Sequence, residues 1–459
     1  MEKERNFFKT VCNIAIPVTL QCMLQSSFSM ADQIMIGRLG SVSIAGVGLA
    51  GKFLSIFNVV VAAIAAVAGI MIAQYMGKKE KRAVSSSFML NLLVAIGLAV
   101  LFTLICAVFP SEIMSVYSKK AATVKVAASY LRILSVTFFP IAISTLVATL
   151  LRCMEKASLP LYASIFAAVV NTGLNYVLIF GKFGMPKLGV SGAAIATVIS
   201  QLANVGCICI MFLLINKKKE THISLSLSIK GVGAKQYLSM LLPLLFTELM
   251  WSLGENVYAI IYGNIGTNEC AAMTLTNPIQ GLLIGALSGL AQAAGIIIGK
   301  ELGKNEFESA YEKAKKLMIY GLMGSIVLSL LLILLSPYYV QIYHVEKEVK
   351  TVGIQLLIAF AIISPVKVQN MILGGGIIRS GGKTKYVMVI DMVGTWLIGV
   401  PLGFLTAFVF HLPIPYVYFI LSLEECVRLL MGLIIFRKKG WMHSLESEEE
   451  ERRKRPHSA

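Results

Sequence analysis

Long apolar runs alternate with short polar connections along nearly the whole chain. Each run holds about 20 or more predominantly apolar residues, which is the length that a helix needs to cross a lipid bilayer. The pattern therefore predicts an all-α integral membrane protein with twelve transmembrane helices. We expect these helices over residues 10–36, 43–75, 84–109, 122–151, 157–180, 189–215, 236–262, 269–299, 314–336, 351–378, 385–410 and 414–436.

The two halves of the chain resemble each other in sequence. A shift of 226 residues aligns residues 17–80 with residues 243–306 without a gap, and it brings a proline, paired glycines and a Gly-Lys-x-Glu sequence into register. Each half holds six predicted spans, an even number, so both halves enter the membrane in the same orientation. The repeat predicts two six-helix bundles related by a pseudo-two-fold axis along the membrane normal.

The polar stretches suggest where these bundles begin and end. We expect an N-terminal six-helix lobe over residues 1–215 and a C-terminal six-helix lobe over residues 236–437. A lysine-rich cytoplasmic linker, 216–235, joins the lobes, and a polar cytoplasmic tail, 438–459, ends the chain. A cleft between two such bundles could open to either side by rocking, which is the physical basis of alternating access.

Composition and charge support a membrane protein. Of the 459 residues, 57% are hydrophobic and only 14% are charged, whereas soluble domains carry about 25% charged residues. The net charge of +17 comes from basic clusters between apolar runs, and no basic stripe interleaved with aromatic residues indicates a nucleic-acid partner. The expected partners are membrane lipids. Basic loops are concentrated on the side of both termini, which places both termini in the cytoplasm of a bacterial inner (plasma) membrane.

The sequence lacks the motifs of a membrane enzyme or an ATP-driven pump. No Walker loop, nucleophile elbow, His-rich box or Asp-rich Mg²⁺ motif occurs in it. The eight cysteines form no CxxC pair and lie mostly inside apolar runs, as small core residues do. A channel would need a selectivity filter, and the polar sites here form no repeated one. We therefore expect a secondary transporter that needs no cofactor.

The ordered motifs resemble the multidrug and toxic compound extrusion (MATE) family. The resemblance covers nearly all of residues 7–440 and rests on residues 36–40 (IGRLG), 74–78 (QYMGK), 171–175 (NTGLN), 186–194 (PKLGVSGAA) and 289–294 (GLAQAA). It implies export of small organic cations or amphiphiles, driven by inward Na⁺ or H⁺. A chain of two halves needs no partner to form its cleft, so we expect it to work as a monomer. Two positions depart from the family pattern, because Asn175 and Lys383 stand where many members carry aspartate. The alternative is a lipid-linked oligosaccharide flippase of the same superfamily, whose cavity would be more cationic.

Helix one of the first half carries a polar stripe. Side chains at helical spacing share one face, and here they are Gln21, Gln25, Phe28 and Asp32. The resemblance implies that Asp32 is the site that exchanges a proton or Na⁺. We expect Gln25 and Phe28, on the same face, to line the substrate cavity. Asn171 and Asn175, one turn apart on helix five, could supply neutral oxygen ligands. The structural alternatives are that Asp32 caps a helix end and that the asparagines only hold helices together.

Helix seven carries two carboxylates on one face. Glu248 and Glu255 are seven residues apart, with Trp251 between them and Tyr258 beyond. A carboxylate face flanked by aromatic rings suits a lipophilic cation, through charge pairing and cation–π contact, and it could equally hold the coupling ion. The structural alternative is that these glutamates form a buried pair with a basic residue such as Lys367.

Three further carboxylates fall within predicted spans near the C-terminus. Asp391 is either an ion ligand or a partner of Lys367. Glu424 and Arg428 are spaced i, i+4, a favourable order for a structural ion pair, and Glu425 faces elsewhere. The sequence chooses neither between Na⁺ and H⁺ nor between the two halves as the place of the coupling site.

Overall fold

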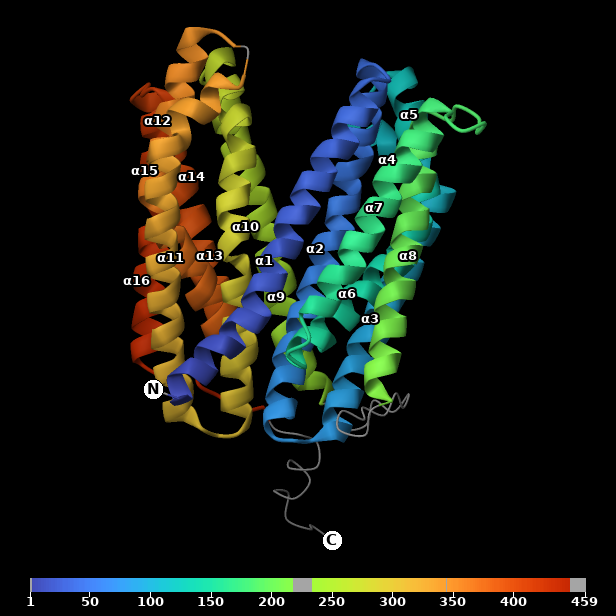
Figure 1. Cartoon of the computed structure of the whole chain (residues 1–459). Coiled ribbons are helices and arrows are strands. Elements are labelled where there is room, and N and C mark those ends of the chain that lie inside the picture. Colours follow the sequence, from blue (N-terminus) through green and yellow to red (C-terminus); the bar gives the residue numbers. More distant parts are fainter. Residues whose placement is uncertain (1, 218–232, 344, 446–459) are drawn as a thin grey trace. The chain divides into compact units, whose positions relative to one another are not determined.

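The computed structural model describes residues 2–217, 233–343 and 345–445. Within these ranges the chain is helical, with short turns between helices and no β-strand. Helices are the expected form, because every backbone polar group in a bilayer must be paired within its own segment. The described residues form two compact units, one of residues 20–72 and 79–217 and the other of residues 2–19, 73–78 and 233–445. In each unit the long helices run side by side (Figure 1).

The first unit contains most of the N-terminal half. Its helices are α1 (Glu2–Gly37), α2 (Ser41–Gly77), α3 (Lys81–Val108), α4 (Pro110–Tyr117), α5 (Ala121–Leu134), α6 (Phe138–Cys153), α7 (Ser158–Phe180) and α8 (Val190–Asn216). The start of α1 and the last turn of α2 belong to the second unit instead. Helix α7 ends at Gly181, whose positive φ of 68° closes the helix, and a Cβ there would lie 2.9 Å from the backbone nitrogen of Lys187.

The second unit contains the C-terminal half. Its helices are α9 (Ala234–Gly263), α10 (Thr267–Gly303), α11 (Phe307–Gln341), α12 (Lys347–Asn370), α13 (Lys385–Met392), α14 (Val400–Phe404), α15 (Ile414–Leu421) and α16 (Glu424–Arg437). Helix α12 continues into a π-helical stretch, Met371–Ile378, and two more π-helical stretches, Val393–Gly399 and Leu405–Val409, flank α14. The predicted linker 216–235 and tail 438–459 lie largely outside the described residues, so these boundaries stay predictions.

The all-α membrane fold predicted from hydropathy is confirmed, with one change at its end. Eleven helices among the described residues are long and apolar enough to cross a membrane. The twelfth predicted span, 414–436, consists of two shorter helices, α15 and α16, which a turn at Ser422 and Leu423 separates. This break places Glu424 and Glu425 in the first turn of α16, where carboxylates interact favourably with the helix dipole.

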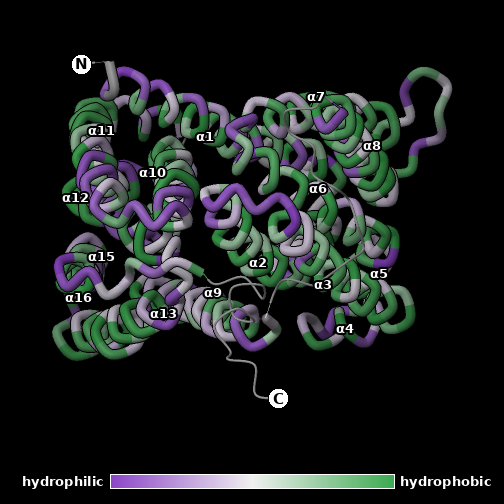
Figure 2. Tube along the Cα trace, turned by 90° about the horizontal axis from the view of Figure 1, so that it is seen from below, coloured by the Kyte–Doolittle hydropathy of each residue, from purple (hydrophilic) through white to green (hydrophobic). Residues whose placement is uncertain are grey.

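Hydrophobic residues make up most of the helices, and hydrophilic residues collect where helices connect (Figure 2). Many large apolar side chains are exposed on single helix faces, among them Leu104, Leu334 and Leu430. Exposed apolar surface of this extent on a soluble protein would mark an interaction site or an aggregation hazard. On a membrane-spanning chain the same surface is covered by lipid.

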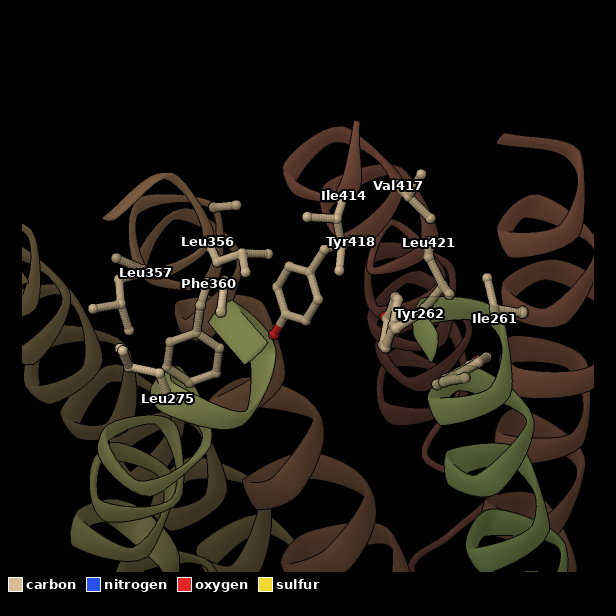
Figure 3. Close-up of a cluster of buried hydrophobic side chains, with 14 of the residues drawn as sticks. Ile261, Tyr262, Leu275, Leu356, Leu357, Phe360, Ile414, Val417, Tyr418 and Leu421 are labelled. Atoms are coloured by element: carbon tan, nitrogen blue, oxygen red, sulfur yellow. The ribbon is translucent and has the colours of Figure 1, made fainter. Parts of the chain in front are cut away.

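The second unit contains a cluster of buried aromatic and aliphatic side chains (Figure 3). Tyr262 and Tyr418 lie with ring centroids 6.1 Å apart, and Phe360 belongs to the same cluster. The Tyr418 hydroxyl donates a hydrogen bond to Gln280 Oε1, outside the apolar cluster, at 3.1 Å. Phe360 and Gln280 also line the cavity described below, so this cluster forms part of the cavity wall.

Candidate functional site

Each unit contains a polar pocket of its own. The pocket of the first unit has a volume of about 230 Å³ and lies among α1, α7 and α8. Three of the predicted site residues on α1 line it, namely Gln25, Phe28 and Asp32, and Asn171 of α7 faces them. The structure therefore brings together residues that the sequence placed on two separate helices.

Asp32 is held by the side chains of α7. Asn175 Nδ2 donates to Asp32 Oδ1 at 2.7 Å. One atom of the Asn171 side-chain amide lies 2.9 and 3.0 Å from the two Asp32 carboxylate oxygens. This atom is best assigned as the nitrogen, which then donates to both carboxylate oxygens, while the amide oxygen accepts from Ser200 Oγ. Asp32 thus binds a neighbouring helix and does not serve as a helix cap. Asn175 Oδ1 is buried and has no hydrogen-bond partner among the described groups, which leaves an amide oxygen with free acceptor capacity near the carboxylate.

Gln21 stands apart from the rest of the polar stripe. Its Nε2 donates to Ser164 Oγ at 2.7 Å, and its Oε1 accepts from Arg152 at 2.9 Å. These two contacts satisfy the amide within the helix packing. The sequence signal was correct for Gln25, Phe28 and Asp32 as pocket-lining residues, but helical spacing alone could not show that Gln21 has partners on α6 and α7.

The pocket of the second unit is larger, about 670 Å³, and lies among α9, α10, α12, α13 and α16. Such a volume suits a drug-sized ligand. Its wall includes Glu248, Trp251, Glu255 and Asp391, four of the predicted site residues. In total it presents five carboxylates and three cationic side chains, which are Glu248, Glu255, Asp391, Glu424 and Glu425, with Lys367, Arg379 and Arg428.

Arg428 is the centre of one charged cluster. Its guanidinium lies 3.5 Å from Glu424, 3.7 Å from Asp391 and 4.0 Å from Glu425, and it also donates to Thr395. The predicted i, i+4 pair of Glu424 and Arg428 is confirmed. Of the two alternatives for Asp391, pairing with Lys367 is not the one seen, because its ion-pair partner in the described structure is Arg428.

Glu248 and Lys367 also have other partners than expected. Arg379 Nη2 lies 3.4 Å from Glu248 Oε1, so Glu248 does pair with a basic residue, as the structural alternative has it, and this residue is Arg379 and not Lys367. Lys367 Nζ lies 3.9 Å from Glu425 Oε1. The other oxygen of Glu425 accepts from Asn370 Nδ2 at 2.8 Å. The charged residues inside the spans were visible in the sequence, but their long-range partners were not.

Glu255 and Tyr258 differ in their surroundings, although they lie less than one turn apart. Glu255 faces the cavity with an exposed side chain, and the described structure gives it neither a hydrogen bond nor an ion pair. Tyr258 is buried at 6% exposure, and its hydroxyl donates to Glu424 Oε2 at 2.6 Å. Tyr258 therefore holds the Glu424 carboxylate in place and is itself absent from the described lining of the cavity, where we expected it.

Sequence reasoning missed several residues of this cavity. Asn370 and Arg379 orient the carboxylates, and Gln280 and Asn277 add neutral polar groups from α10. A signal existed for Arg379, which lies between two glycine groups in an otherwise apolar stretch. Its neighbour Gly376 packs closely on α10, where a Cβ would lie 2.6 Å from the Ala291 carbonyl oxygen. This contact supports close helix packing as the role of that glycine.

Comparison with known proteins gives the family. The MatE family model matches the chain twice, over residues 17–177 and 243–405, and the two matches start 226 residues apart, as the internal repeat requires. The uncharacterized transporter YisQ of Bacillus subtilis is 23% identical, with 92% of each chain covered. The probable multidrug resistance protein NorM of Bacillus thuringiensis is 25% identical, with 88% of this chain and 90% of the relative covered.

Solved structures show the same fold. A crystal structure of MATE in complex with MaL6 superposes with a TM-score of 0.85 at 20% identity, covering 94% of this chain and 96% of the other. An outward-facing multidrug resistance MATE family transporter gives a TM-score of 0.83 at 20% identity, with 94% and 96% covered. The chain therefore belongs to the MATE family of multi-pass membrane transporters and is not an enzyme.

Proposed function

We propose that this transporter is a secondary active exporter that exchanges organic cations or other amphiphiles for Na⁺ or H⁺ by alternating access. The observation that carries the proposal is the cavity of about 670 Å³ in the second unit, whose wall combines five carboxylates with Trp251 and Phe360. Carboxylates in membrane helices are costly and normally mark transport pathways. The NorM relative is named a probable multidrug resistance protein, which also supports drug export as the function.

Within this cavity the carboxylates have different tasks. Glu255 has no hydrogen bond and no ion pair within 4.0 Å among the described residues and so can attract a cationic substrate, while Trp251, one turn earlier on α9, offers an aromatic face to it. Glu248 and the Arg428 cluster are already paired, and their hydrogen bonds and ion pairs keep the wall in shape. Binding of a lipophilic cation then replaces the missing positive partner of Glu255.

Coupling is proposed for the pocket of the first unit. Asp32, with the buried Asn175 Oδ1 beside it, offers oxygen atoms to Na⁺ or a carboxylate to a proton. Oxygen ligands of this kind suit hard cations. Coupling requires that occupancy of this pocket and of the second cavity bias the same conformational equilibrium, and that effect is reciprocal. In this proposal Asp391 contributes to charge balance in the second cavity through its contact with Arg428.

The flippase alternative has less support. A site for a pyrophosphate-linked substrate needs a surplus of positive charge, whereas the cavity carries five carboxylates and three cationic groups. We also propose that the protein works as a monomer in the bacterial inner membrane. Both termini would be cytoplasmic, because the basic connections are concentrated on their side.

The test is efflux from drug-sensitive bacterial cells that express the protein. Ethidium or norfloxacin efflux is measured with and without Na⁺, and with and without a protonophore. Efflux that follows Na⁺ and survives the protonophore would establish Na⁺ exchange, and efflux that collapses with the proton gradient would establish H⁺ exchange. Absence of efflux of both compounds, at good expression, would contradict the exporter and favour the flippase.

A further inference from the structure

Helix α2 passes from one unit of the structure into the other. Its residues 41–72 belong to the first unit, and its last turn, residues 73–77, belongs to the second. Helix α1 also passes between the units, after residue 19, and it carries Pro17 close to that point, where proline can bend a helix. Helix α2 contains no proline and is α-helical throughout. A movement of the units is therefore easiest if the last turn of α2 is released.

The segment after α16 packs against the second unit as a strap. We call residues 438–445 the C-terminal strap. Trp441 is fully buried, and Leu445 is only 3% exposed. Both residues lie over glycines, because a Cβ on Gly381 would collide with the Trp441 carbonyl oxygen and a Cβ on Gly382 would lie 2.9 Å from Leu445 Cδ2. The strap is thus anchored to the second unit at two places.

Gln74, in the last turn of α2, ties this turn to the strap. Its buried Nε2 donates to the His443 carbonyl oxygen at 3.1 Å, and its Oε1 accepts from the Leu445 backbone N–H at 2.7 Å. The side-chain amide therefore pairs with the strap as a peptide group of a neighbouring strand would. The same Nε2 also donates to the Ser380 carbonyl oxygen at 2.7 Å. A single side chain thus makes three hydrogen bonds that hold the end of α2 in the second unit.

The strap can open without unfolding a helix. After Trp441 it has no regular secondary structure, and His443 is exposed between the two anchors. The Ser444 hydroxyl is buried without a hydrogen-bond partner in the described part of the chain, which destabilises the closed arrangement. On opening, water can hydrate this hydroxyl and replace the strap as a partner of Gln74. The closed strap therefore depends on few contacts, as a segment that switches between two arrangements does.

We propose that the C-terminal strap is a latch: when closed it holds the last turn of α2 in the second unit, and its release during alternating access frees that turn. This inference rests on the proposed export function and adds a conformational control to it. A latch shifts the balance between two conformations by the free energy of its contacts. Weakening the tie at Gln74 should therefore favour the released state, and fixing the strap should stop the cycle.

A buried cysteine reports whether the strap opens. Leu445→Cys in the purified full-length protein, in lipid nanodiscs, is treated with a fluorescent maleimide, and the unsubstituted protein, with its native cysteines, gives the background. Adding Gln74→Ala should accelerate labelling about tenfold or more, because the hydrogen bonds to the strap are lost. Adding Gln341→Ala is the matched control, since Gln341 is exposed at the end of α11. Equal labelling rates with and without Gln74→Ala would overturn the latch.

A second reporter separates opening of the strap from general loosening of the protein. Val417 is fully buried in the cluster of Figure 3, which does not include the strap. Labelling of Val417→Cys should stay slow when Gln74→Ala is added. Equal acceleration at Val417→Cys and Leu445→Cys would contradict a local latch.

A disulfide tests whether transport needs the release. A Cβ on Gly382 would lie 3.8 Å from Leu445 Cγ, which is close to the place that the sulfur of Leu445→Cys takes, so cysteines at both positions can form one. The double variant Gly382→Cys/Leu445→Cys should lose ion-driven uptake of ethidium into everted vesicles on oxidation and regain it on reduction. The two single variants are the controls, and their uptake should not depend on oxidation.

Transport and labelling can fail separately. Equal uptake by the oxidised and the reduced double variant, with the disulfide formed, would overturn the latch and support the exporter. Absence of ion-driven uptake by the unsubstituted protein would overturn the exporter, and the labelling rates at Leu445→Cys would still decide whether the strap opens.

Discussion

At the scale of single residues, Asp32 has the most specific surroundings of the predicted coupling residues. Two asparagine amides of α7 donate to its carboxylate, so both oxygens are held in place. Asparagine has nearly the same shape and can keep part of these contacts, but it can neither bind a proton at neutral pH nor offer a charge to Na⁺. Asp32→Asn therefore separates the coupling role from the structural one.

We expect Asp32→Asn to fold normally and to lose ion-driven uptake of substrate into everted vesicles. The loss should be about 5- to 150-fold, because coupling free energies are roughly 1–3 kcal/mol. Glu112→Gln is a suitable control, since Glu112 is exposed on α4 and absent from the described pocket lining. Ion-driven uptake at the wild-type level in Asp32→Asn would remove Asp32 from the mechanism.

Glu248 and Glu255 lie on the same face of α9 but differ in their partners. Both Glu248→Gln and Glu255→Gln should reduce export of a cationic dye, because each removes negative charge from the cavity. Only Glu248→Gln should lower the free energy of unfolding, by about 1–3 kcal/mol, since it leaves Arg379 with a neutral neighbour. Thermal unfolding in detergent and ethidium export from everted vesicles measure the two effects. Unchanged export in both variants would exclude α9 from substrate binding.

At the scale of elements, hydropathy predicted the long membrane-spanning helices. The apolar runs located eleven long helices, because lipid requires both the length and the apolar surface. Hydropathy could not show that the last run is broken at Ser422 and Leu423, since α15 and the body of α16 are both apolar. The break matters for the cavity, because it starts a helix at Glu424 and Glu425.

Ion pairs within one helix could be predicted from the sequence, whereas ion pairs between distant helices could not. Glu424 and Arg428 were predicted as a pair because four residues along one helix bring side chains together. Glu248 and Arg379 are 131 positions apart, and only the packed helices bring them within 3.4 Å. The sequence therefore identified the residues that line both pockets better than it identified their partners.

The last turns of α2 and α10 cross at a reciprocal glycine contact within the second unit. A Cβ on Gly77 would collide with the Lys300 carbonyl oxygen, and a Cβ on Gly303 would collide with the Gln74 carbonyl oxygen. In the repeat, Gly77 aligns with Gly303 and Gln74 aligns with Lys300. The two equivalent turns thus pack backbone against backbone, which explains why glycine stands at both positions.

Alanine at either of these glycines should force the turns apart. We expect Gly77→Ala and Gly303→Ala each to lower the free energy of unfolding by about 1–3 kcal/mol, as overpacking of close contacts does. Gly97→Ala on α3 is the matched control, because nothing lies within 4 Å of its added methyl group. It should be neutral or slightly stabilising, since alanine favours a helix. Thermal unfolding of the three variants measures these effects. Equal stability of all three variants would contradict the close contact between the two turns.

At the scale of the whole molecule, distant parts of the sequence are joined at the end of the second unit where α2 terminates. Gln74 donates to the Ser380 and His443 carbonyl oxygens, and its own Oε1 accepts from the Leu445 backbone at 2.7 Å. The residues after α16 include Trp441, which is fully buried and stacks on Phe436 with ring centroids 5.7 Å apart. No local pattern predicts these contacts, because Gln74 and Leu445 lie 371 positions apart.

The orientation of the whole chain in the membrane gives the last prediction. With both termini in the cytoplasm, the turn between α2 and α3 is cytoplasmic and the loop between α7 and α8 faces outward. Lys79 lies in the first of these, and Phe183, 87% exposed, lies in the second. In intact cells, a membrane-impermeant maleimide should label Phe183→Cys and spare Lys79→Cys, and in everted vesicles the labelling should reverse. The unsubstituted protein, with its native cysteines, sets the background. Labelling of Lys79→Cys from outside would reverse the proposed topology, and with it the direction in which the ion gradient could drive substrate.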